Sequence, residues 1–477
     1  MHGMRDISPQ EWNKRQTLLE SMRNFLKLHG YQSVDTPILE DTDLFLRKSG
    51  GELAAKMFTF INPGGSRVSL RPEFTSSIVR AYVTGVVNAP LPIRLQCSGP
   101  VFRYEVIESA DYHQFTQVSA EILGASGPMA DAETVFLASA LLSRTGLKKH
   151  RIILGHVGAI NDLLESIGLT ERTRVFLLGN MGLLSCGGDG KDRVREMAQV
   201  VGLFSADPNQ EKLSRLLKGL DDEMALELIQ WFLKDTVNGP MGSREPEEVF
   251  ARFLQKLKGT DGFTKFEVGL DLMSRLALLR GAPAEVLREA ASVIKSSGID
   301  PAPLNIINQL IEAIGYHDLE SVPLELDLGM VRGIAYYTGL VFSIEHPAIQ
   351  GQAPLCGGGR YDGLVSALGG AEDVPALGFA CSVERIIEAI VAEGEAPTHK
   401  GESSGILVMC KEPRFYLQAQ QLAQMSREQG ITTQIDLNSR SVEQNMDYAK
   451  FSGLGTVVVV GADGSVETYP IDGAQFS

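Results

Sequence analysis

The chain has 477 residues, of which 44% are hydrophobic and 22% charged, an ordinary composition for a globular protein of two or three domains. Its net charge of −15 speaks against a protein that holds nucleic acid mainly through bulk positive charge, although a local basic patch is compatible with it. Five scattered cysteines without a CxxC pair favour a reducing compartment and argue against a structural zinc site, so we expect no bound metal. The N-terminus lacks the apolar core of a signal peptide and no apolar run reaches about 18 residues, so we expect a cytoplasmic protein.

The first predicted element is an amphipathic helix that begins after Ser8 and ends near Leu28. Ser8 is a good cap, Pro9 suits the first helical turn, and Glu11 is expected to complete a capping box with Ser8.

Mainly extended segments follow this helix. The patterns predict a hairpin over 57–61 and 68–71 and further strands at 93–97, 101–104 and 115–123. In the last strand Gln117, Ser119 and Glu121 lie on one face, so Gln117 and Glu121 point the same way, because successive side chains alternate between the two faces. One helix followed by mainly antiparallel strands favours an α+β fold over a doubly wound one.

The middle of the chain, from about 170 to 316, predicts a helical insertion. Apolar spacing of the i, i+3, i+4 type indicates helices at 213–220, 223–233, 246–257 and 284–295. The polar segment 393–404 is the clearest linker. Beyond it, strands alternate with helices, which predicts a small three-layer α/β domain with parallel strands.

Residues 324–342 form the stretch with the clearest chemical content. Two extended runs, 324–328 and 338–342, enclose a turn that carries Arg332, Tyr336 and Tyr337. A guanidinium and two phenols at the mouth of a sheet suit a small polar ligand. The alternative is a plain hairpin with an exposed arginine and two core tyrosines.

Six motifs in order resemble one family. Three are similar to the signature motifs of class II aminoacyl-tRNA synthetases: Thr36-Pro37-Ile38-Leu39-Glu40, Phe102-Arg103-Tyr104-Glu105 and Gly378-Phe379-Ala380 to Glu384-Arg385. The other three are similar to histidyl-tRNA synthetase in particular: Arg71-Pro72-Glu73-x-Thr75, Val331-Arg332-Gly333-Ile334-x-Tyr336-Tyr337-Thr338-Gly339 and Gly357-Gly358-Gly359-Arg360-Tyr361-Asp362. The resemblance implies a class II synthetase-like antiparallel sheet flanked by helices, which pairs through the first motif into a homodimer.

The implied domains follow from this resemblance. They are a synthetase-like core at 1–169 and 321–392, a helical insertion at 170–320, a linker at 393–404 and an anticodon-binding-like α/β domain at 405–477.

The resemblance also implies the site. Histidine would contact seven residues: Glu73, Thr75, Gln117, Glu121, Arg332, Tyr336 and Tyr337. Arg103 and Arg385 would clamp the phosphates of ATP, because guanidinium forks match phosphate oxygens. Arg332 would be the catalytic residue of an active enzyme, which would use ATP with Mg²⁺ but no permanently bound cofactor.

The segment after Arg103 departs from the family pattern. Asp111 and His113 occupy positions where phosphate-binding arginines are expected, Glu108 adds negative charge, and Ala335 replaces an acid before the tyrosine pair. The histidine-holding residues are kept while the nucleotide-holding ones are eroded. We therefore predict the non-catalytic paralogue, a histidine-binding regulatory subunit that partners the catalytic ATP phosphoribosyltransferase of histidine biosynthesis. The alternative is an active histidine–tRNA ligase that acts on histidine, ATP and tRNA, so the sequence leaves open whether the chain is an enzyme.

Overall fold

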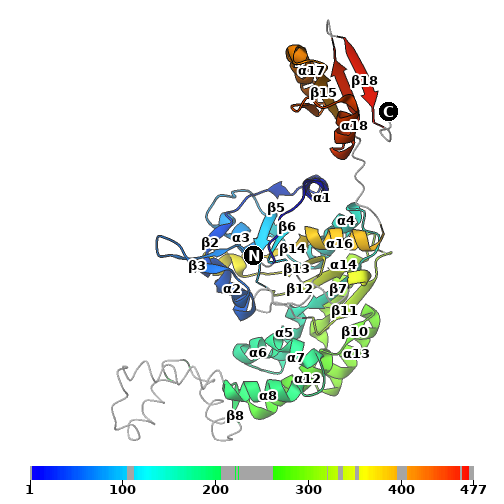
Figure 1. Ribbon diagram of the computed structural model, residues 1–477. Helices are drawn as coiled ribbons and strands as arrows, with labels where there is room; N and C mark the ends of the chain where they lie inside the picture. Colours follow the sequence, from blue (N-terminus) through cyan, green and yellow to red (C-terminus); the bar gives the residue numbers. More distant parts are fainter. Residues whose placement is uncertain are drawn as a thin grey trace. The chain divides into compact units, whose positions relative to one another are not determined.

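The computed structural model describes residues 3–104, 112–205, 221, 224, 261–319, 321–330, 337–349, 354–394, 405–461 and 465–471. The chain divides into two compact units, Met1–Pro397 and Thr398–Ser477, and the boundary between them falls inside the predicted linker (Figure 1).

The first unit is built on a nine-stranded sheet with the order β1-β5-β6-β14-β13-β12-β7-β11-β10. Its strands are β1 (Gln32–Ser33), β5 (Ile93–Phe102), β6 (Gln114–Leu123), β7 (Arg151–His156), β10 (Arg280–Gly281), β11 (Leu324–Asp327), β12 (Leu340–Glu345), β13 (Cys356–Arg360) and β14 (Ala376–Ser382). Two neighbouring pairs, β1–β5 and β7–β11, are parallel and the other pairs are antiparallel. The α+β fold is confirmed, with a mixed rather than purely antiparallel sheet.

Two predictions about strands were wrong. The segments at 93–97 and 101–104 are parts of one strand, β5, which continues through Ser98, Gly99 and Pro100 while paired to β6. The runs around residue 332 do not form a hairpin, because β7 lies between β11 and β12 and pairs with both. The partner strand β7 lies more than 150 residues upstream of both runs, so local spacing carried no sign of it.

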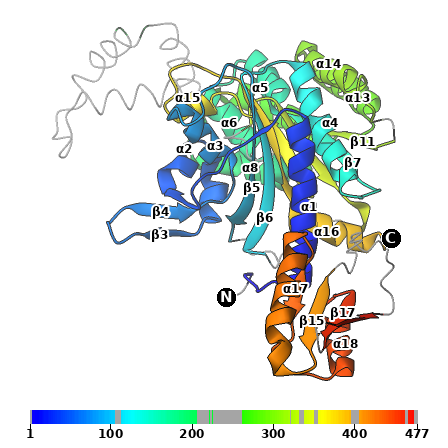
Figure 2. The same ribbon diagram turned by 90° about the horizontal axis from the view of Figure 1, so that it is seen from above.

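One face of this sheet is covered by α1 (Pro9–Leu28), α4 (Pro128–Arg144) and α16 (Val383–Ala392), while α5 (Val157–Ser166) follows β7 and contacts β12. Figure 2 shows α1 running along β5 and β6. The apolar spacing in this helix predicts one face made of Leu18, Leu19, Met22, Phe25 and Leu26; all but Phe25 are buried in this core, and Phe25 is partly buried against it. The Ser8 hydroxyl accepts the backbone N–H of Glu11 at 3.3 Å, but the Glu11 carboxylate pairs with Arg5, so the reciprocal half of the predicted capping box is replaced by an ion pair.

The opposite face carries α3 (Thr75–Val83) and α15 (Leu364–Ala367), which enclose a second apolar cluster. A small sheet stands beside α3. It contains β2 (Leu39–Asp41), β3 (Thr59–Ile61) and β4 (Arg67–Leu70) in the order β2-β4-β3, flanked by α2 (Thr42–Ala55). The pairing of β3 with β4 confirms the hairpin predicted there.

Helices dominate the described part of 170–316, as expected. They are α6 (Glu171–Gly179), α7 (Met181–Ser185), α8 (Gly190–Val200), α12 (Phe263–Leu276), α13 (Pro283–Ser296) and α14 (Asn305–Ile314), with the two-residue strands β8 (Phe204–Ser205) and β9 (Asp261–Gly262). The predicted helix at 284–295 is α13, whereas those at 213–220, 223–233 and 246–257 lie almost wholly outside the described residues. Because β10 pairs with β11 and α14 packs on α4, the stretch after residue 280 is continuous with the main sheet.

A buried ion pair ties α4 to β13. Arg360 donates through Nε to the Asp131 carboxylate at 2.9 Å and through a terminal nitrogen to the Ala125 carbonyl at 2.9 Å. Burial raises the pKa of the Asp131 carboxyl in spite of the guanidinium beside it. Both side chains are withdrawn from water, so each depends on the other for compensation of its charge.

The second unit is a four-stranded sheet with the order β16-β15-β17-β18. Its elements are β15 (Ile406–Cys410), α17 (Tyr416–Glu428), β16 (Thr433–Ile435), α18 (Val442–Phe451), β17 (Thr456–Val460) and β18 (Val466–Pro470). The first three strands are parallel, with α17 and α18 packed on opposite faces, which confirms the predicted three-layer arrangement. The antiparallel strand β18 was missed, because its alternation of Val, Glu, Thr and Tyr lies in a short polar tail.

Candidate functional site

The site is centred on Glu121 of β6. Along this strand Val118, Ala120 and Ile122 enter the core under α1 and α4, so the alternate residues Ser119 and Glu121 face the α3 side of the sheet. Glu121 is only 1% exposed and lies opposite Gly378 of β14. A Cβ atom at residue 378 would overlap the Glu121 carboxylate, so glycine at this position provides the room for that side chain.

Three hydroxyl groups donate to the Glu121 carboxylate. Thr75 and Ser119 both donate to Oε1 at 2.7 Å, and Tyr361 donates to Oε2. Burial raises the pKa of the Glu121 carboxyl to about 7 against the opposing effect of these hydrogen bonds. The group is therefore divided between its charged and neutral forms near neutral pH.

Glu73 and Gln117 add further acceptors near Glu121. Glu73 caps α3, since its carboxylate accepts the backbone N–H of Ser76 at 3.0 Å, and its charge helps to raise the pKa of Glu121. Gln117 is 6% exposed, and its Oε1 is a buried acceptor without a hydrogen-bond partner in the described part of the chain. A buried acceptor left unpaired is costly, so this oxygen is poised for a donor on a bound molecule.

Tyr337 connects the acidic residues to Arg103. Burial raises the pKa of the Tyr337 phenol, Glu121 and Glu73 raise it further, and Arg103 opposes them. Arg103 is itself held by a hydrogen bond from its Nε to the Pro72 carbonyl at 2.8 Å, and its guanidinium lies over the Phe115 ring at 5.4 Å. These contacts bring Glu73, Thr75, Gln117, Glu121 and Tyr337 of the predicted histidine set into one region.

Arg103 and Arg385 lie beyond the same end of the sheet. Arg103 follows β5, whose last residue pairs with the first of β6, and Arg385 follows β14, whose last residue pairs with Gln117. Arg385 is buried and donates to Glu388 at 2.9 Å. A phosphate that approached Arg385 would have to share this guanidinium with Glu388.

The first turn of α16 is anchored by Glu384. Its carboxylate accepts the backbone N–H of Thr116 at 2.8 Å and pairs with Arg15 of α1 at 3.1 Å. This contact fixes the start of α16, and with it Arg385, against β6.

Several residues singled out in the sequence lie outside the described residues: Arg332, Ala335 and Tyr336 in one segment, Glu108 and Asp111 in another. His113 is described, and it packs into an aromatic cluster. Its ring centroid lies 4.8 Å from that of Tyr104 and 5.9 Å from that of Phe58.

Sequence reasoning assigned no role to Tyr361 or Gly378 and placed Ser119 only on the face of β6 that carries Glu121. Tyr361 belongs to the glycine-rich motif at 357–362, but its partner Glu121 is 240 residues away. The one local sign was the alternation of Gly357, Gly359 and Tyr361, which places all three on one side of the extended chain.

The two ends of the site differ in their chemistry. One end offers carboxylate, amide and hydroxyl groups that suit an ammonium and ring N–H donors, and the other carries two guanidinium groups that suit phosphate or carboxylate. Within the described residues no group of three or more His, Cys, Asp or Glu is placed to hold a metal ion. No helix in the described part of the chain is long and apolar enough to cross a membrane.

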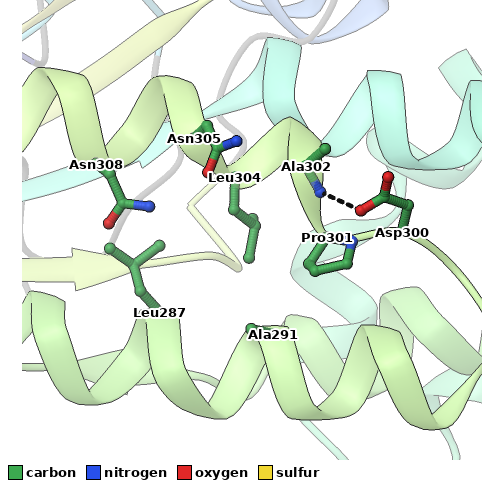
Figure 3. A pocket seen from close by; sticks show the side chains of 8 residues that line it. All are labelled: Leu287, Ala291, Asp300, Pro301, Ala302, Leu304, Asn305 and Asn308. Atoms are coloured by element: carbon green, nitrogen blue, oxygen red, sulfur yellow. Dashed lines mark hydrogen bonds between the residues drawn. The ribbon is translucent and has the colours of Figure 1, made fainter.

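A separate cavity of about 270 Å³ lies between α13, α14 and the turn that joins them. Figure 3 shows Asn305 and Asn308 of α14 above Leu287 of α13, with Asp300 accepting the backbone N–H of Ala302 at 3.0 Å. None of its lining residues belongs to the Glu121 site, and its single acidic side chain is already used locally.

Comparison with solved structures defines the class of the fold. The protein named "ATP phosphoribosyltransferase regulatory subunit/histidyl-tRNA synthetase" from Bacillus halodurans matches with a TM-score of 0.63, 22% identity and coverage of 97% of each chain. The fold is that of a class II synthetase. The histidyl-tRNA synthetase family model matches residues 3–181 and 242–386, and the chain belongs to this family.

Curated relatives match over almost the whole chain. The histidine–tRNA ligase of Pyrococcus furiosus is 28% identical over 459 residues, which cover 96% of this chain and 90% of the relative. That of Sulfolobus acidocaldarius is 29% identical over 463 residues, with 97% and 90% covered.

Proposed function

We propose that the Glu121 pocket binds histidine. Glu73, Gln117 and Glu121 supply acceptors for the ammonium and imidazole N–H groups, and Thr75 and Tyr337 complete the described wall. The unpaired Oε1 of Gln117 supports this assignment, because a ligand ammonium would satisfy it. Arg332 and Tyr336 are proposed for the same pocket on the resemblance alone.

We further propose that the chain is a histidine–tRNA ligase. The observation that carries this proposal is the match to curated ligases across both units of the chain. The histidine carboxylate would attack the α-phosphorus of ATP and release pyrophosphate, and the histidyl group would then pass to tRNA. Arg103 and Arg385 would hold the phosphates, Arg332 would offset the developing charge, and Mg²⁺ would arrive with ATP.

The second candidate is the regulatory subunit that the sequence favoured. Asp111 stands where a phosphate-binding arginine is expected, and unit charges of like sign 4 Å apart repel by about 4 kcal/mol near a protein surface. His113 packs against Tyr104 and Phe58, in place of the other expected arginine. Histidine would then bias an assembly with the catalytic phosphoribosyltransferase through its different affinities for two states. The fold is compatible with both candidates.

Histidine-dependent ATP–pyrophosphate exchange separates the two. The ligase proposal predicts exchange by the purified chain that requires histidine and is not supported by other amino acids. In Arg103→Gln exchange should fall by about 100-fold, the scale of losing one preorganised charge contact, while histidine still binds. Histidine binding by calorimetry without any exchange would leave the regulator as the function, and absence of histidine binding would remove both.

We also propose a homodimer through the small sheet. Ile38, Leu39, Phe60 and Ile61 are exposed apolar side chains on or beside β2 and β3, and Ile61 is 64% exposed. Exposed apolar side chains gathered on one small sheet suit an interface.

Ile61→Glu should convert the dimer to monomer, because it places a charge in the apolar contact. The measurement is sedimentation velocity at micromolar protein concentration. Leu28→Glu is the matched control, since Leu28 is 87% exposed at the end of α1, away from this sheet. A dimer that persists in the Ile61 variant contradicts the proposed interface.

A further inference from the structure

Glu121 receives its three hydroxyl donors from three separate parts of the fold. Thr75 is the first residue of α3, Ser119 lies two residues earlier on β6, and Tyr361 directly follows β13. Tyr361 is 1% exposed, and its ring is packed in the apolar cluster beneath α3 and α15. Its hydroxyl is thus delivered to the carboxylate by a side chain that is enclosed by the core.

The number of acceptor positions on a carboxylate limits what else Glu121 can bind. Two oxygens offer about four lone-pair positions. Thr75 and Ser119 use both positions on Oε1, and Tyr361 uses one on Oε2. Counting only donors in the described part of the chain, one position on Oε2 is left for an N–H donor, and the three hydroxyls fix its direction.

We propose that Tyr361 is a positioning residue for ligand binding: its hydroxyl orients the Glu121 carboxylate and keeps it in the charged, accepting form. The inference rests on the proposed binding of histidine and goes beyond it by assigning a role to a residue that need not touch the ligand.

The groups that face Glu121 determine how its charge responds to pH. Burial and the Glu73 carboxylate favour the neutral acid, and the three hydroxyl donors favour the carboxylate. Among the described residues, the phenols of Tyr337 and Tyr31 also lie within electrostatic range of Glu121, and Tyr337 is in turn influenced by Arg103. Loss of the Tyr361 hydroxyl therefore raises the pKa of Glu121 further above its ordinary value. At pH 7 a larger share of the carboxyl would be protonated, and the neutral acid accepts a weaker hydrogen bond from an N–H than the carboxylate does.

The test is histidine affinity by isothermal titration calorimetry from pH 6 to pH 9, for the full-length chain and for Tyr361→Phe. The ratio of the two dissociation constants cancels the titration of histidine itself. If the pKa of Glu121 rises by one unit from about 7, the variant should bind about fivefold more weakly at pH 7 and about tenfold more weakly at pH 6. The ratio should shrink to about twofold or less at pH 9, where the carboxyl is ionised in both proteins.

Tyr31→Phe is the matched control. Tyr31 is also a buried tyrosine, 2% exposed, and its hydroxyl has no hydrogen-bond partner in the described part of the chain. Removal of this hydroxyl should leave both the affinity and its pH profile unchanged.

The role of Tyr361 and the binding of histidine are contradicted by different results. A ratio that stays constant from pH 6 to pH 9, whether near one or far from it, overturns the role of Tyr361 while histidine binding stands. No binding by the unsubstituted chain at any pH overturns the proposed function, and the role of Tyr361 with it. Thermal unfolding of both variants shows that a changed profile comes from a folded protein.

Discussion

Gly378→Ala is expected to abolish measurable histidine binding, with a loss of affinity of about 100-fold or more. The added methyl group would overlap Glu121 Oε2 and would lie 2.6 Å from the Ala120 carbonyl oxygen. The strand cannot retreat easily, because β14 is paired on both sides, to β6 and to β13. The carboxylate must then leave its three donors, and a buried acid without them costs about 3 kcal/mol or more, which corresponds to that loss.

The matched control is Gly357→Ala in the neighbouring strand. A Cβ at residue 357 meets only the Phe342 carbonyl oxygen, at 3.7 Å, which is an ordinary contact. Calorimetry with histidine should therefore give the same affinity for this variant as for the unsubstituted chain. Normal binding by a folded Gly378→Ala protein would show that Glu121 does not hold the ligand.

Arg360→Met should lower the free energy of unfolding of the first unit by about 3 to 5 kcal/mol. The substitution leaves the Asp131 carboxylate buried without its partner and removes the donor to the Ala125 carbonyl. Because burial already raises the pKa of Asp131, the variant should be less destabilised at acidic pH, where that carboxyl is neutral. Urea unfolding followed by circular dichroism at pH 5 and pH 8 measures both effects.

Two further variants check the origin of this loss. Asp131→Leu combined with Arg360→Met removes both charges and should recover a large part of the stability. Arg275→Met removes an exposed pair with Asp271, whose charged atoms are 4.0 Å apart, and should cost less than about 1 kcal/mol. If Arg360→Met lowered the free energy of unfolding no more than Arg275→Met does, the buried pair would not contribute substantially to the stability of β13.

The sequence predicted best the features that repeat within one element. The period of two along β6 correctly placed Gln117 and Glu121 on one face, and the spacing in α1 identified its buried residues. The helix order and parallel strands of the second unit were predictable for the same reason. The buried face of a helix or strand can be predicted because the spacing of apolar residues within that one element reveals it.

Contacts between distant segments could not be predicted in this way. The insertion of β7 between β11 and β12 rules out the plain hairpin that was the alternative for residues 324–342, and the partnership of Tyr361 with Glu121 joins residues far apart in the chain. His113 stands where the family pattern has a phosphate-binding arginine, and the sequence did not indicate that its ring packs with Tyr104 and Phe58. In each case the deciding partner comes from another part of the sheet, and a single sequence does not specify strand order.

The alternation along β6 has a consequence for how this protein could change its ligand. Odd-numbered residues from 117 to 121 build the binding side, and even-numbered residues from 118 to 122 build the packed interior. Substitutions confined to the odd-numbered residues could adapt the binding site to another amino acid while leaving the packed interior unchanged. Insertion of one residue into this strand would exchange the two sets of side chains. Glu121 would then point into the apolar interior and Ile122 toward the binding side, so ligand recognition and folding would be lost together.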